Sequence, residues 1–111
     1  MRIAIPEIVG HLVRWEFSDG PVPGQTFEHV FNHDGTVTHR TAAAPEYTTE
    51  QHYECIQVGH SVFAVTYLAS TGWTLTSLLD VDTGTLVSFA SNEKELVVSH
   101  GTFVVVPQIA A

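Results

Sequence analysis

Turn-forming residues recur along this chain roughly every ten residues, and they divide it into short segments rich in β-branched and aromatic side chains. Asp34-Gly35 and Gly84 are typical of tight hairpins, because glycine there supplies the positive φ that such turns need. Apolar residues at helical spacing are nearly absent. The pattern predicts antiparallel strands joined mostly by hairpins, as in a β-sandwich or a β-barrel.

The expected strands number about eight or nine. They cover residues 11–17, 25–32, 36–42, 52–58, 61–69, 73–81, 85–91, 95–100 and 102–106, the last two being bent or interrupted at Gly101. Residues 1–10 are expected to be a lead-in segment, with Pro6 and Gly10 as breaks. Residues 48–51 could form a helical turn opened by a threonine.

So many strands in 111 residues favour a barrel, because closure removes the exposed sheet edges that invite aggregation. We therefore expect an all-β fold in which residues 1–111 form a single domain, a small closed antiparallel barrel. A two-sheet sandwich is the alternative. A barrel of about eight strands has an interior that is filled by side chains or holds one small ligand.

Alternation along the strands predicts which side chains point inward. If the second hairpin turns about Asp34, residues equally distant from it lie opposite each other. The predicted pairs are Phe31 with Val37, His29 with His39, and Glu28 with Arg40. The apolar pair then lies on one face and the ion pair on the other, so the register is self-consistent.

The same alternation predicts an interior of aromatic side chains with polar tips, which is the usual composition of a ligand site. The candidate ligand-binding residues are Trp15, Phe17, Phe27 and Tyr67, and the candidate catalytic residues are His29 and His39. Two facing buried imidazoles favour neutrality, with one N–H donating to the other ring. Such a pair could act as a general acid or base. The alternative is that both histidines are packed without any chemistry.

Charge and motifs exclude several classes of function. Twelve acidic and four scattered basic residues give a net charge of −8, which argues against binding to nucleic acid or to an anionic membrane. No HExxH motif, Cys/His zinc spacing or Gly-x-Ser-x-Gly elbow is present, so we expect no metal, no cofactor and no serine nucleophile. A single cysteine, Cys55, and the lack of a signal peptide or a long apolar run predict a cytoplasmic protein.

Several segments resemble a known family. Trp15-Glu16-Phe17 with Asp19-Gly20, and then residues 32–40, are similar to the start of the phenolic acid decarboxylases and the related MoaF-like domains. Residues 62–72 and 84–89 resemble later strand–turn segments, so the similarity covers about residues 8–92. The resemblance implies a calycin-like barrel of lipocalin type, with an internal ligand cavity and often a homodimer.

The decarboxylase residues are missing at the matching positions. The two tyrosines that hold the substrate carboxylate in that family correspond to Trp15 and Phe17 here, the arginine to Glu46, and the catalytic glutamate to Ala69. The resemblance therefore implies a MoaF-like relative without decarboxylase activity.

The function that these features favour is the binding of a small apolar or aromatic molecule inside the barrel. One alternative is a cofactor-free lyase or isomerase that uses His29 or His39 as acid or base and Tyr67 as a donor. Another is a homodimeric structural or interaction domain, which the low charged fraction of 14% and the valine-rich residues 102–106 would suit.

Overall fold

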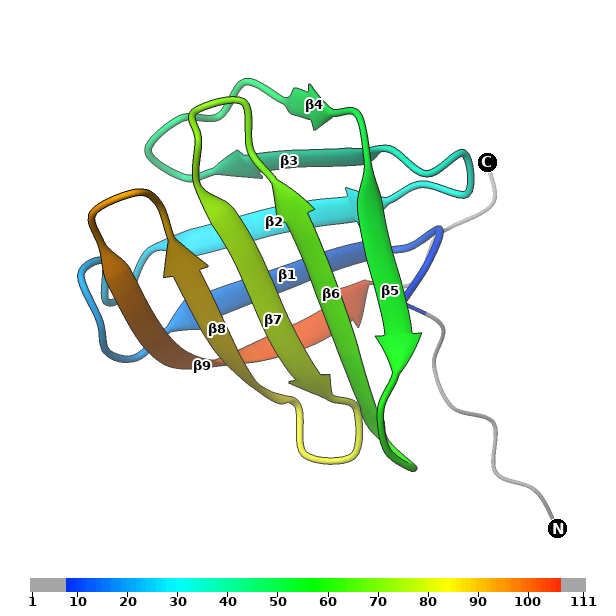
Figure 1. Ribbon diagram of the computed structural model, residues 1–111. Helices are drawn as coiled ribbons and strands as arrows, with labels where there is room; N and C mark the ends of the chain where they lie inside the picture. Colours follow the sequence, from blue (N-terminus) through cyan, green and yellow to red (C-terminus); the bar gives the residue numbers. More distant parts are fainter. Residues whose placement is uncertain (1–7, 107–111) are drawn as a thin grey trace, which may run out of the picture.

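The computed structural model describes residues 8–106, which form nine β-strands and, within that range, no helix (Figure 1). The strands are β1 (Leu12–Phe17), β2 (Thr26–Phe31), β3 (Val37–Thr41), β4 (Thr48–Glu50), β5 (Tyr53–Gln57), β6 (Val62–Leu68), β7 (Thr74–Asp80), β8 (Thr85–Ser91) and β9 (Leu96–Val106). They pair antiparallel in the order β4-β3-β2-β1-β9-β8-β7-β6-β5. The predicted all-β barrel is confirmed. No helix in this range could span a membrane.

The barrel is nearly closed, because β4 and β5 are the two ends of the sheet and follow each other in the chain. Tyr53 of β5 bonds to the turn between β2 and β3. Its amide donates to the carbonyl of Gly35 at 3.1 Å, and its hydroxyl donates to the carbonyl of Asn32 at 2.9 Å. Individual hydrogen bonds rather than a continuous ladder therefore join β5 to the β2–β3 hairpin.

Two expectations about individual elements are wrong. Residues 48–51 do not form a helical turn, because β4 pairs with β3 and places Glu50 opposite Val37. The last two expected strands are one strand, β9, which is not interrupted at Gly101 and curves strongly along its length (Figure 1). A glycine fits there because β1 passes so close that a Cβ atom at position 101 would clash with the carbonyl oxygen of Glu16.

The predicted register of the β2–β3 hairpin is confirmed at all three pairs. On its outer face, Glu28 is buried beneath Arg14 and Arg40, whose Nη2 and Nε atoms lie 2.8 and 2.6 Å from its carboxylate oxygens. Burial raises the pKa of Glu28, but the hydrogen bonds from Arg40 and Arg14 outweigh it, so the pKa lies below its usual value. Both arginines are thereby held on the outside of the barrel.

One end of the barrel is filled. Its core contains the side chains of Ile8, Val13, Phe31, Val37, Val65, Leu79, Leu86 and Phe103. Four of these side chains are completely shielded from solvent: Val13, Phe31, Val37 and Leu79. Of the expected lead-in segment, residues 1–7 lie outside the described residues, whereas Ile8 belongs to this core.

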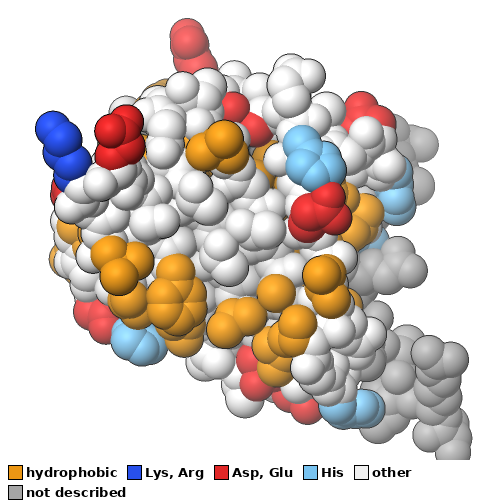
Figure 2. Space-filling view, viewed as in Figure 1, with side chains coloured by type: hydrophobic (Ala, Val, Ile, Leu, Met, Phe, Trp, Pro, Cys, Tyr) orange, Lys and Arg blue, Asp and Glu red, His pale blue; other side chains and the backbone are white. Residues whose placement is uncertain are grey.

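The outer face of the sheet over β5–β9 carries exposed apolar side chains. Figure 2 shows apolar side chains as an interrupted band across this face, with acidic side chains at several places along its margins. The most exposed members on these strands are Ile56, Leu68, Leu96 and Val104.

Candidate functional site

The opposite end of the barrel is hollow. A cavity of about 400 Å³ lies where β1, β3, β6 and β8 end and where β2, β7 and β9 begin. Its walls are mainly aromatic and aliphatic, and the exposed residues Pro21, Val22 and Thr71 surround its mouth. The lining residues on the strands are Trp15, Phe17, Phe27, His29, His39, Thr41, Tyr67, Leu75, Ser88, Ala90, Val97 and Ser99.

Small inward-facing side chains produce this space. Ser77, Ser88 and Ser99 lie side by side on β7, β8 and β9, and Ala90 is the next inward residue on β8. The Ser77 and Ser88 hydroxyls are 2.6 Å apart, so these two buried groups satisfy each other. At the filled end the next inward positions on β7 and β8 carry Leu79 and Leu86 instead, and Phe103 is a further core residue of β9.

All six residues predicted for the site line the cavity: Trp15, Phe17, Phe27, His29, His39 and Tyr67. They come from the consecutive strands β1, β2 and β3 and from the more distant β6, and the inward alternation of each strand brings them together. The structure therefore brings these six side chains together around one cavity, while their binding and catalytic roles remain predictions.

His29 and Tyr67 form a buried polar pair. His29 Nε2 lies 2.7 Å from the Tyr67 hydroxyl, and the His29 ring stacks on Trp15 with 4.1 Å between ring centroids. Burial, and secondly the neighbouring His39, lower the pKa of His29 well below its ordinary value. Burial, and secondly the charge of Glu50, raise the pKa of Tyr67 far above its ordinary value. The pair is therefore a neutral imidazole and an un-ionised phenol.

His39 takes a different partner. Its Nε2 atom lies 3.0 Å from Oε2 of Glu50, a residue that is only 5% exposed. The His29 and His39 rings face each other at 5.5 Å, with 23° between their planes. Ring nitrogens of stacked imidazoles point along the ring planes rather than at each other. The expected hydrogen bond between the two histidines is therefore wrong, although they are neighbours.

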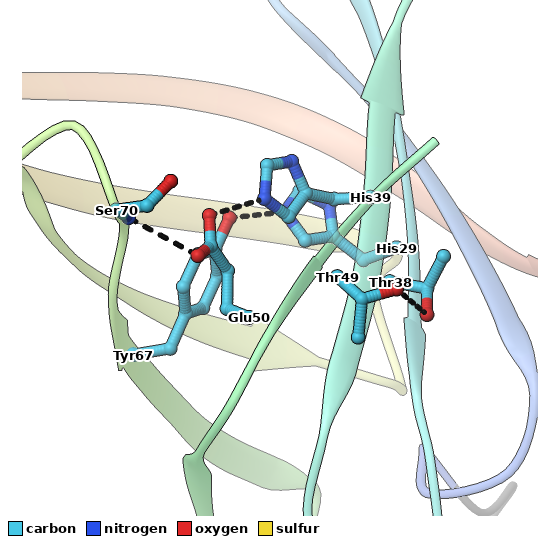
Figure 3. Close-up of polar contacts among 7 residues, drawn as sticks. All are labelled: His29, Thr38, His39, Thr49, Glu50, Tyr67 and Ser70. Carbon is cyan, nitrogen blue, oxygen red and sulfur yellow. Dashed lines mark hydrogen bonds and ion pairs between the residues drawn. The ribbon is translucent and has the colours of Figure 1, made fainter. Parts of the chain in front are cut away.

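Glu50 is the residue that the sequence reasoning missed. Its Oε1 atom accepts a hydrogen bond from the Ser70 amide at 3.1 Å, while Oε2 contacts His39 (Figure 3). Glu50 does not line the 400 Å³ cavity; it borders a separate surface depression on the other side of Tyr67. Residues 48–50 are extended, and strand alternation from Thr48 to Glu50 is the sequence signal for its position.

The charged groups of the described residues lie outside the cavity. No lysine or arginine among residues 8–106 lines it. Within the same range, no three His, Cys, Asp or Glu side chains are grouped as metal ligands would be. His52 and Glu54, which could have contributed to such a group, form an exposed pair on the surface.

These features define a nearly closed antiparallel barrel with one packed end and one hollow, largely apolar end. The chain is similar to a solved structure from Burkholderia vietnamiensis described as a "putative beta-lactamase", with a TM-score of 0.75 and 15% sequence identity. The similarity covers 94% of this chain and 100% of the other, and at this identity it concerns the fold alone. No family model and no curated protein matches the sequence, so the MoaF-like and calycin relationship stays a prediction.

Proposed function

We propose that this protein binds a small apolar or aromatic organic molecule in the hollow end of its barrel. The observation that carries the proposal is the cavity itself, with aromatic walls and three polar side chains, His29, His39 and Tyr67, among its lining. Its volume of about 400 Å³ lies within the roughly 300–1,000 Å³ typical of small-molecule sites. The lipocalin-type use of a barrel interior, which the MoaF-like resemblance implies, supports the same proposal.

The cavity walls favour a flat ligand. Trp15, Phe17, Phe27 and Trp73 provide aromatic surface, which gains most from contact with another planar apolar group. Because His29, Tyr67 and Trp15 are almost completely buried, the polar lining lies deep in the barrel, away from the mouth formed by Pro21 and Val22. We therefore expect a ligand with one hydrogen-bonding group at its inner end.

The test uses the neutral fluorescent probe N-phenyl-1-naphthylamine and two variants in which an alanine is replaced by phenylalanine. Ala90 lines the cavity, whereas Ala64 lies on the outward-facing side of β6. We expect saturable binding by the wild type, at least tenfold weaker binding by Ala90→Phe because the new ring occupies the cavity, and unchanged binding by Ala64→Phe. Circular dichroism establishes that both variants are folded. Equal probe affinity of the two variants, or no binding by the wild type, would contradict the proposal.

A second candidate function is a cofactor-free lyase or isomerase. The contact between His39 and Glu50 favours it, because a carboxylate that orients an imidazole is the arrangement of many general bases. His39 also lines the cavity and could therefore reach a bound ligand. Protein-catalysed deuterium exchange at an acidic C–H of a bound compound, lost in Glu50→Gln, would distinguish this candidate from simple binding.

The oligomeric state, the location and the partners of the protein are the remaining parts of the proposal. A homodimer and a cytoplasmic location stay predictions from the sequence. The proposed partner is a small molecule; neither nucleic acid nor a membrane surface is proposed, because the chain carries a net charge of −8. The beta-lactamase activity named for the structural neighbour is not proposed for this chain.

A further inference from the structure

The cavity holds no positive charge that could neutralise an anionic ligand. The nearest arginines along the barrel wall, Arg14 and Arg40, lie on the outer faces of β1 and β3 and bind Glu28 there. Moving an organic anion from water into such a site loses its hydration without a compensating ion pair. An uncharged molecule of the same shape does not incur this loss.

A carboxylate lies immediately behind the polar lining. Glu50 contacts His39, and after burial its charge is the second cause that raises the pKa of Tyr67. If His39 carries one ring proton, the His39–Glu50 pair has a net charge of −1; if it carries two, the net charge is 0. The pair is therefore never positive while the carboxylate is ionised.

The second imidazole does not provide a cation either. His29 is buried against Trp15, His39 and Tyr67, and its burial strongly disfavours the protonated ring. The hydroxyls of the lining, on Thr41, Thr71, Ser88 and Ser99, are uncharged. Every polar group of the lining is thus neutral or adjacent to a negative charge.

We propose that the cavity selects uncharged ligands over organic anions, and that Glu50 sets this selection. The inference rests on the proposed binding function and adds the charge class of the ligand. It separates this protein from barrels that hold carboxylates, since those need a cationic or multiply donating group at the ligand's acidic end.

The experiment compares two compounds of nearly identical shape, 2-naphthamide and 2-naphthoate, as competitors of bound N-phenyl-1-naphthylamine at pH 7.5. We expect 2-naphthamide to displace the probe at a concentration at least tenfold lower. In Glu50→Gln this ratio should shrink, mainly because 2-naphthoate binds more tightly. The matched control is Glu54→Gln, which removes an exposed carboxylate on the neighbouring strand β5 and should leave the ratio unchanged.

Thr41→Lys adds a second test that does not depend on the folding of the Glu50 variant. Thr41 lines the cavity near its edge and is only partly buried, so a lysine there places an ammonium group beside the ligand. We expect this variant to prefer 2-naphthoate. Equal displacement of the probe by both compounds from the wild type overturns the charge selection and leaves the binding proposal intact. Failure of the probe itself to bind overturns the proposed function instead.

Discussion

His29 connects the charge state of a single side chain to the stability of the fold. The ring is buried between Trp15 and His39, and its one polar contact among the described residues is with Tyr67. In the unfolded chain the same ring is hydrated and takes up a proton near its ordinary pKa of about 6.5. In the folded protein the pKa is well below that value. Protonation therefore favours the unfolded state.

Because protonation of His29 favours the unfolded state, we expect the protein to become less stable as the pH falls. Stability contributed by His29 is present above pH 6.5 and is lost as the pH falls from there toward the folded-state pKa, with a slope of at most about 1.4 kcal/mol per pH unit. Urea unfolding between pH 7.5 and 5 measures it. His29→Gln should flatten the curve, while His60→Gln, at an exposed turn, should not. A curve of unchanged slope in His29→Gln would show that another group is responsible.

The carboxylates whose pKa is lowered do not contribute to the loss of stability expected between pH 6.5 and 5. Glu28, Asp19 and Asp34 have pKa values below their ordinary ones, so the stability they contribute is present at neutral pH and is lost only when the pH falls through those lowered values. These three carboxylates therefore do not account for a loss of stability between pH 6.5 and 5.

The cavity residues differ in how far local sequence could predict them. Trp15 and Phe27 alternate with charged or polar neighbours on regular strands, so period-two reasoning placed them correctly. Glu50 is a weaker case for the same reasoning, because β4 has only three residues and the other two, Thr48 and Thr49, are also polar, so alternation alone does not mark Glu50 as buried. Its burial depends on pairing with Val37 and on contacts with His39 and Ser70, which are tertiary interactions.

Strand β9 shows how a neighbouring element decides the shape of another. A glycine inside a run of valines predicts a break or a bend; β9 is not broken at Gly101, and it pairs there with both β1 and β8. The pairing is possible because the missing side chain leaves room for the backbone at Glu16 and Phe17. Sequence reasoning recognised the unusual residue but not the strand that approaches it.

The element-scale prediction is that Gly101→Ala is strongly destabilising. The new methyl group would clash with the Glu16 carbonyl oxygen and also crowd Phe17 Cα, so the β1–β9 ladder must shift. We expect a loss of about 1–3 kcal/mol in the free energy of unfolding, as for other overpacked sites. Denaturant titration measures it. Gly59→Ala is the control, because its nearest neighbour is Val62 at 3.7 Å; similar effects of the two changes would contradict the explanation.

At the scale of the whole molecule, the number of strands predicted a barrel, but not how it closes. The sequence favours complete closure because free edges are a liability. In the structure, β4 and β5 remain the ends of the sheet, and Tyr53 connects β5 to the β2–β3 hairpin by two hydrogen bonds. Strand β4 has only three residues, so it offers few backbone groups for pairing at this end of the sheet. The segment between β3 and β4 has no periodic pattern from which the length of β4 could be predicted.

The whole-molecule prediction concerns amide hydrogen exchange. Contact with neighbouring side chains is dense around Phe31 and Leu79 at the filled end and sparse around the cavity. We expect slower exchange for the amides of the filled end than for those of Phe27, Thr41 and Ala90, by at least tenfold. Saturation with N-phenyl-1-naphthylamine should slow the second group selectively. Uniform protection along each strand in the free protein would contradict this division.

The inward serines and alanine of β8 and β9 separate two properties that most small domains combine in one core. Residues such as Leu86 and Phe103 at the filled end contribute the buried area that stabilises the barrel, while Ser88, Ala90 and Ser99 decide how much space remains for a guest. A change at one of these three positions would alter the size of the accepted molecule and leave the packed end unchanged. The same scaffold could therefore be redesigned for different guests by single substitutions, without rebuilding its core.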